Sequence, residues 1–167
     1  MSNYWHIQLH PGHLERFDDE QFNKAIDAGI IGMCRGWNND RGMPVMFRYD
    51  VAIGDIIMVR HHGAKVLVEV ISDVYENNRV QDFWFDTVRN VKVLSRDGKL
   101  YQSQFDGDWK EGLNMNASFQ SAKNNKFILY WTNEVLKLQL KELREVNESV
   151  SIVKSKYSID IKINIVP

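Results

Sequence analysis

The sequence predicts an α+β domain built on a curved, largely antiparallel β-sheet, with short helices and one long amphipathic helix near the C-terminus. Three observations predict it: strand-like segments gather between residues 4 and 94, turn signals separate them, and a leucine-rich helical pattern follows from residue 126. Strands followed by a helix favour a mixed fold over regularly alternating strand and helix units.

The bulk composition bounds the size and class of the protein. The chain has 167 residues, 44% hydrophobic and 26% charged, which is ordinary globular composition and enough for one domain over residues 1–167. The single Cys34 excludes an internal disulfide and a cysteine zinc site. Neither a secretion signal nor an apolar run of roughly 20 residues is present, so we expect a cytoplasmic protein without a membrane segment.

The charge balance limits the kind of nucleic-acid binding that is reasonable. Lys and Arg number 21 against 22 Asp and Glu, for a net charge of -1. Without a global positive field, sequence-blind coating of long nucleic acids is disfavoured. A pocket that recognises a single nucleotide is compatible with this charge balance.

The first elements follow from alternation and capping. Residues 4–10 alternate apolar with polar and stop at Pro11-Gly12, which predicts a strand and a turn. Residues 18–26 begin with acidic side chains and space Phe22 and Ile26 four apart, which predicts a helix.

The middle of the chain predicts three further strands and a hairpin. Residues 30–35 are a short apolar run, and residues 36–44 are rich in Gly, Asn, Asp and Pro, hence a loop. Residues 56–60 and 65–71 are β-branched runs around a turn at 61–64, which predicts a hairpin. Residues 83–94 alternate weakly and predict one long strand or a bulged pair.

The C-terminal part predicts a turn, a helix and a final strand. The Asp-Gly pair within residues 96–99 is a turn signal, and a polar segment with possible short strands extends to Ser121. Residues 126–146 form the best helical pattern, with Leu136, Leu140 and Leu143 on one face, and we expect this face to pack on the sheet. Residues 157–166 alternate almost strictly, which predicts a strand that closes an edge, or a chain that continues into a longer protein.

Motifs for catalysis, metals and cofactors are absent from the sequence. The pairs His10/His13 and His61/His62 lack cysteine partners and zinc-protease spacing, and Cys34 lies in an apolar run. Nucleophile elbows and glycine-rich phosphate loops do not occur. We therefore predict a binding module rather than an enzyme, with no metal and no cofactor.

Two tryptophan-bearing segments are the best candidates for a binding site. Trp37 stands among Arg35, Asn38, Asn39 and Arg41, and Trp84 follows the hairpin. Indole rings stack on bases, amides pair with base edges, and guanidinium groups bind phosphate. The alternative is that both tryptophans are packing residues, as we expect for Trp5 and Trp131, and that the polar loop is ordinary loop chemistry.

The order of these features resembles the EVE domains of the PUA-like superfamily, relatives of the YTH readers of methylated RNA. The similarity lies in Tyr4-Trp5 at the first strand, the strand 30–35 running into Trp37-Asn-Asn, and the segment Ile53-Gly-Asp-Ile-Ile-Met-Val with the strand that follows it. It covers about residues 4–95. The resemblance implies a PUA-like β-barrel, and such domains occur as N-terminal modules of McrB-type modification-dependent restriction systems.

The resemblance also implies a cage for a flipped base. We expect its walls to be Trp37, Trp84, Met33 and Cys34. Contacts to the nucleic acid are expected from Arg35, Asn38, Asn39, Arg41, His61 and His62. The function implied is recognition of methylated DNA, either N6-methyladenine or a modified cytosine, for a downstream AAA+ GTPase or nuclease partner outside this chain. The alternatives are a reader of a modified RNA base, and a protein-interaction domain or small enzyme that docks through the helix at 126–146.

Overall fold

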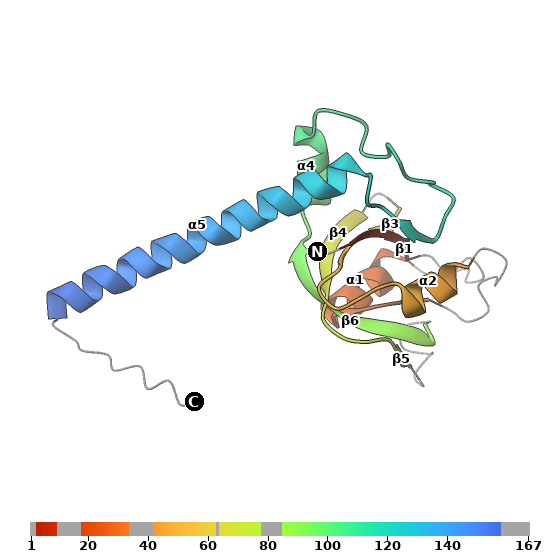
Figure 1. Cartoon of the computed structure of the whole chain (residues 1–167), viewed down its shortest axis with the longest axis horizontal. Coiled ribbons are helices and arrows are strands. Elements are labelled where there is room, and N and C mark those ends of the chain that lie inside the picture. The colour runs from red at the N-terminus through yellow and green to blue at the C-terminus, as the bar shows by residue number, and fades with distance from the viewer. Residues whose placement is uncertain (1–2, 10–17, 34–41, 63, 78–84, 158–167) are drawn as a thin grey trace. The chain divides into compact units, whose positions relative to one another are not determined.

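The computed structural model describes residues 3–9, 18–33, 42–62, 64–77 and 85–157. The chain divides into two compact units, Met1–Thr132 and Asn133–Pro167. Among the described residues, the first unit holds the sheet, three shorter helices and the start of one long helix, and the second consists of the continuation of that helix (Figure 1).

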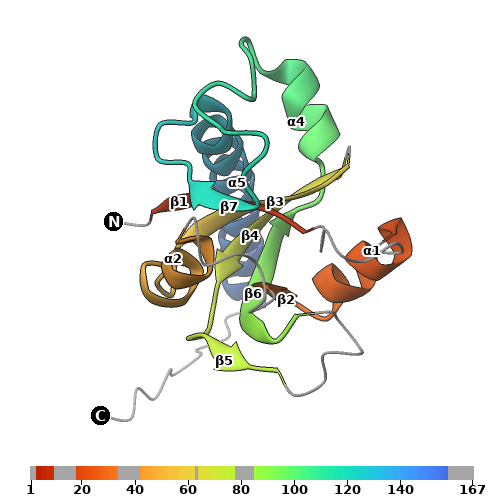
Figure 2. The same cartoon turned by 90° about the vertical axis from the view of Figure 1, so that its right-hand side faces the viewer.

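The first unit is built on one curled sheet, visible in Figure 2. Its strands run in the order β2-β6-β4-β3-β1-β7, and β5 pairs with β6 beyond this path. The strands are β1 (Tyr4–Gln8), β2 (Ile30–Met33), β3 (Ile56–His61), β4 (Ala64–Val70), β5 (Tyr75–Glu76), β6 (Thr87–Ser95) and β7 (Phe119–Ser121). Among these pairings only β1 with β3 is parallel. The predicted α+β class, with a curved and largely antiparallel sheet, is confirmed.

Four helices accompany the sheet in the described residues. They are α1 (Asp19–Asp27), α2 (Met43–Tyr49), α4 (Gly98–Gln104) and α5 (Lys126–Tyr157). The predicted first helix is confirmed with its N-terminal signal, because the Asp18 carboxylate accepts a hydrogen bond of 3.0 Å from the Gln21 amide. The predicted hairpin at 56–71 is likewise confirmed as β3 and β4.

One face of the sheet forms the main hydrophobic core with α1 and α2. Phe22 and Ile26 of α1 and Phe47 of α2 are completely buried there. Strands β1, β3 and β4 supply alternate residues, namely Trp5, Ile7, Ile57, Val59, Val66 and Val68, and β6 adds Val88 and Val91. Each helix and strand thus buries its one apolar face against the others, and the core needs no disulfide.

An aromatic cluster covers the opposite face of the sheet. Trp131, in the first turns of α5, lies 5.7 Å from both Tyr101 of α4 and Phe127, measured between ring centroids. Gly98 makes the close approach of α4 possible, since a Cβ at this position would lie 2.5 Å from the Lys65 Cβ and 2.9 Å from the Trp131 ring. The sheet is therefore covered on both faces within the first unit.

Several sequence-based boundaries were wrong. The Asp-Gly pair at residues 97–98 begins α4 instead of a hairpin turn, and the expected loop at 36–44 overlaps α2, which has Pro44 in its first turn. Helix α5 continues past residue 146 to Tyr157, so the predicted strand at 157–166 does not include Tyr157, and its remaining residues lie outside the described part.

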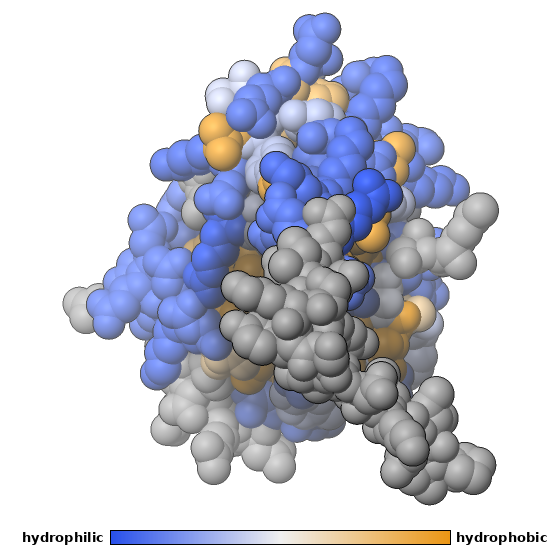
Figure 3. Space-filling view, turned by 90° about the vertical axis from the view of Figure 1, so that its left-hand side faces the viewer, coloured by the Kyte–Doolittle hydropathy of each residue, from blue (hydrophilic) through white to orange (hydrophobic). Residues whose placement is uncertain are grey.

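The apolar side chains of α5 differ in exposure between its start and its continuation in the second unit, and the predicted packing of residues 126–146 on the sheet remains a prediction for the second unit. Phe127, Ile128 and Trp131 are fully buried, whereas Leu136, Leu140 and Leu143 are 46%, 56% and 60% exposed. On the face shown in Figure 3, hydrophobic residues form small separate patches among hydrophilic ones. In the described residues, no helix combines the length and apolar character that crossing a membrane requires.

Candidate functional site

Most of the predicted site residues lie outside the described residues. These are Trp37, Trp84, Cys34, Arg35, Asn38, Asn39 and Arg41. Met33, His61 and His62 are described, as are the residues on both sides of the two tryptophan-bearing segments. The site is therefore built from the elements that hold these segments.

The histidine pair at the hairpin separates into two different environments. His61 is completely buried, its Nδ1–H donates a hydrogen bond of 2.9 Å to the Leu9 carbonyl, and its ring stacks on Phe22. The ring is thus engaged inside the fold, and the predicted contact between His61 and nucleic acid remains a prediction. His62 is exposed in the turn with a φ of 46°, and its predicted role remains a prediction.

The two tryptophan-bearing segments are anchored at one place on the sheet. Met33, the last residue of β2, pairs with Thr87, the first residue of β6, and Glu76 of β5 pairs with the same Thr87. Trp37 comes four residues after Met33, and Trp84 comes three residues before Thr87. The register of β2, β5 and β6 thus brings the attachment points of both segments side by side. We call the paired residues Met33, Thr87 and Glu76 the anchor.

Two buried residues fix this anchor. Met33 is 1% exposed and packs in the main core, at the end of β2, where the cage was expected. Gly32 precedes it, and a Cβ at Gly32 would lie 2.6 Å from the Phe85 Cβ and 2.7 Å from the Thr87 carbonyl oxygen. Strand β2 can lie this close to the residues that follow the second segment only because position 32 is glycine.

Arg48 joins α2 to this anchor, and sequence reasoning missed it. Its Nη2 donates hydrogen bonds to the Glu76 carboxylate at 2.6 Å and to the Thr87 hydroxyl at 3.2 Å. The side chain is about one-third exposed, at 31%. Arg48 was not identified as a site residue from the sequence because α2, the helix that carries it, was not predicted. Arg48 places a positive charge on a fixed scaffold beside the attachment points.

The Gly54-Asp55 segment is scaffold. Asp55 is 2% exposed and accepts hydrogen bonds from the Trp5 indole N–H and the Asn3 amide at 2.8 Å, and from the Ala52 amide at 3.0 Å. Its carboxylate is thereby turned into the fold and ties β1 to the start of β3. No group of three or more His, Cys, Asp or Glu side chains among the described residues is arranged to hold a metal ion.

Comparisons with known proteins add no relative. No family model matches this chain, and no curated protein matches it. The functional argument therefore rests on the residues and on the geometry of the anchor.

Proposed function

We propose that this chain is a recognition module that binds a modified base in DNA, flipped into a cage walled by Trp37 and Trp84. The observation that carries the proposal is the pairing of Met33 with Thr87, which attaches both tryptophan-bearing segments at one edge of the sheet. A PUA-like barrel and a link to a modification-dependent restriction system belong to the same proposal, as the EVE resemblance implies.

Chain length limits how far each indole can lie from the shared anchor. Four residues from Met33 to Trp37 span at most about 14 Å, and three residues from Trp84 to Thr87 span at most about 11 Å. Paired strand residues are themselves about 5 Å apart. Both tryptophans are thus within a short reach of the same pair of strand residues, which is compatible with two aromatic faces enclosing a base.

Arg48 gives this region an electrostatic partner for nucleic acid. Its guanidinium is held by Glu76 and Thr87 but stays partly exposed. This guanidinium, whose charge Glu76 balances, can still contribute N–H donors to a phosphate without reading sequence. Base discrimination would come from the cage, since stacking contributes about 1 to 3 kcal/mol per base and offsets the few kcal/mol of base extrusion.

The test is a titration of the whole chain with matched DNA duplexes at fixed salt. One duplex carries N6-methyladenine, one a modified cytosine, one neither, and a matched RNA is the fourth ligand. We expect a methylated duplex to bind best and Trp37→Ala or Trp84→Ala to weaken it roughly 5- to 150-fold.

The control variant is Tyr49→Ala, which removes an aromatic ring that is 74% exposed and lies outside both segments. It should leave affinity unchanged. Equal affinity for modified and unmodified duplexes would overturn the proposal, and preference for the RNA would assign the chain to RNA readers, since the 2′-hydroxyl distinguishes the two.

The second candidate function is self-association through α5, favoured by its exposed leucines. Leu136 and Leu143 lie one heptad apart with Leu140 between them, the spacing at which two copies of a helix pack together. Light scattering should then show a dimer for the wild type and a monomer for Leu136→Gln/Leu143→Gln. Lys141→Gln on the same helix is the matched control. A monomeric wild type would exclude this candidate.

A further inference from the structure

Two cations face each other on the sheet, away from the tryptophan-bearing segments. The register pairs Gln8 of β1 with Arg60 of β3, and Arg60 with Lys65 of β4. Directly paired residues point to the same face, and here it is the face opposite to core residues Val59 and Val66. Like charges in this position destabilise a sheet unless something compensates them.

Within the described residues, neutral groups surround these two charges. Arg60 donates to the Gln8 side chain at 2.6 Å and to the Met115 carbonyl at 3.2 Å, and its Nε lies 3.3 Å from the His6 ring. Lys65 donates to the Gln102 side chain at 2.6 Å. No carboxylate of the described chain lies within 4.0 Å of either cation.

Two further ammonium groups increase the positive charge at this place. They belong to Lys99 and Lys110. Lys65 is only 5% exposed, and its Nζ lies 4.2 Å from the centre of the Trp109 ring. The Lys110 Nζ lies 5.6 Å from the centre of the same ring. Burial lowers the pKa of Lys65, and the charges of Arg60, Lys99 and Lys110 lower it further. Four cations therefore act on one another here.

The hydrogen-bond donors of the pair are only partly used. A guanidinium has five N–H donors and an ammonium has three. The two donors on Nη1 of Arg60 have no acceptor among the described residues, and Lys65 uses one donor on Gln102. Unused charged donors near one another are what an oxyanion binds.

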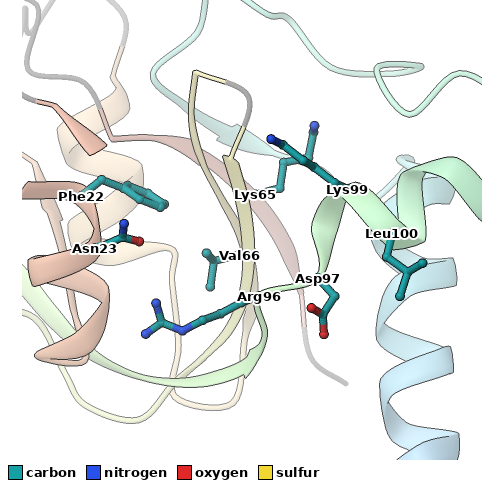
Figure 4. A pocket seen from close by; sticks show the side chains of 8 residues that line it. All are labelled: Phe22, Asn23, Lys65, Val66, Arg96, Asp97, Lys99 and Leu100. Atoms are coloured by element: carbon teal, nitrogen blue, oxygen red, sulfur yellow. The ribbon is translucent and has the colours of Figure 1, made fainter. Parts of the chain in front are cut away.

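The cluster also borders an open space. Lys65 and Lys99 line a cavity of about 340 Å³ together with Phe22, Asn23, Val66, Arg96, Asp97 and Leu100. In Figure 4 the Lys65 and Lys99 side chains overlap in the view, while Arg96 extends toward α1. Arg96 is engaged by Asp27, which leaves Lys65 and Lys99 as the cations of this cavity without an ion pair in the described chain.

We propose that Arg60 and Lys65, with Lys99 and Lys110 around them, form a binding site for a phosphate group. Asp97 also lines the cavity, but no carboxylate of the described residues lies within 4.0 Å of Arg60 or Lys65. The phosphate supplies negative charge at that distance and accepts the unused N–H donors. Binding relieves the repulsion across the Arg60–Lys65 pair, so the protein should become more stable when the site is filled. This site goes beyond base recognition and is independent of Trp37 and Trp84.

The test is calorimetric titration of the whole chain with inorganic phosphate against chloride at constant ionic strength, together with thermal melting. We expect saturable binding, a raised melting temperature, and affinity about tenfold or more weaker in Lys65→Gln. Because Lys65 is buried, the exposed double variant Lys99→Gln/Lys110→Gln repeats the test without risk to the fold, and should also bind more weakly. The matched control is Lys92→Gln/Lys123→Gln, which removes two exposed positive charges outside the proposed site.

A second arm identifies the source of the phosphate. If an unmodified DNA duplex competes with inorganic phosphate and loses affinity in Lys65→Gln, the site holds nucleic-acid backbone; if it does not compete, the site serves free phosphate or a small phosphorylated molecule. Absence of saturable phosphate binding, or equal weakening in the control double variant, overturns the proposal. Because inorganic phosphate carries no base, failure of base discrimination in Trp37→Ala leaves this result unaffected.

Discussion

The indole N–H of Trp5 donates a hydrogen bond of 2.8 Å to the buried carboxylate of Asp55, across fifty residues of sequence. Trp5 also stacks on Phe119 at 5.1 Å between ring centroids, so these two contacts connect β1 to the residue before β3 and to β7. The Gly-Asp motif at residues 54–55 thereby stabilises the sheet through the Asp55 carboxylate.

Asp55→Ala should lower the free energy of unfolding by about 3 to 5 kcal/mol, because three N–H donors lose their buried acceptor. Asp55→Asn should cost less, since one side-chain oxygen remains. Urea unfolding followed by tryptophan fluorescence measures both variants. A loss below about 1 kcal/mol for Asp55→Ala would show that these donors find other partners.

Gly32→Ala should destabilise the attachment of β2 to β6. The new methyl group would overlap the Phe85 Cβ and the Thr87 carbonyl, and such overpacking typically costs about 1 to 3 kcal/mol. Because the same overlap displaces the anchor of both tryptophan-bearing segments, affinity for modified DNA should fall as well. Unchanged stability together with unchanged binding would contradict the close approach.

Arg89→Met should cost about 2 to 4 kcal/mol of stability. The buried guanidinium donates to the Phe47 carbonyl at 3.1 Å, the Ser72 carbonyl at 3.2 Å and the Arg48 carbonyl at 3.0 Å, so it fastens the end of α2 to β6. Arg89→Lys should restore little, because one ammonium cannot reproduce the planar fork. Chemical denaturation compares the variants, and full rescue by lysine would argue that charge alone matters.

His6 should make stability depend on pH. Burial first, and the charge of Arg60 second, lower the pKa of His6 to about 4. The Arg60 Nε–H donates to His6 Nε2 at 3.3 Å, so a proton added to that nitrogen would lose this hydrogen bond and face the guanidinium. Since the unfolded imidazole takes up its proton near pH 6.5, stability is complete above that value and falls as pH decreases toward about 4, by about 3 kcal/mol.

The measurement for His6 is urea unfolding at about pH 7 and about pH 4.5. Carboxylates contribute to the slope in this range, so the comparison is with His6→Gln, which cannot titrate. We expect the wild type to lose more stability than His6→Gln between the two conditions. Parallel losses would mean that His6 is protonated as easily in the folded as in the unfolded chain.

Two substitutions on α5 should separate its buried start from its exposed continuation. Phe127→Ala should cost about 3 to 5 kcal/mol, because the ring is completely buried among Phe105, Trp109 and Trp131. Leu136→Gln, at a position 46% exposed, should change stability by no more than about 0.5 kcal/mol. Similar losses in both variants would contradict the difference in burial.

Much of the fold was predictable from local pattern. Alternation identified β1, β-branched runs around a turn identified β3 and β4, and acidic residues at the start identified α1, because these signals come from neighbouring residues. Helices α2 and α4 were missed since Gly, Asp and Pro also start helices, and the contact of Gly98 with Lys65 decides which structure forms. The candidate site was predictable only as two tryptophan-bearing segments, and its roles for Trp37 and Trp84 remain predictions.

The sequence by itself determined the α+β class, the hairpin and the start of the long helix, because each depends on periodicity and turn chemistry within a few residues. Only the tertiary structure decided that β1 lies parallel to β3, that Met33 meets Thr87, and that Arg60 and Lys65 stand side by side. These relations join residues far apart in the chain. They depend on strand register, which packing of the whole sheet selects and no local pattern contains.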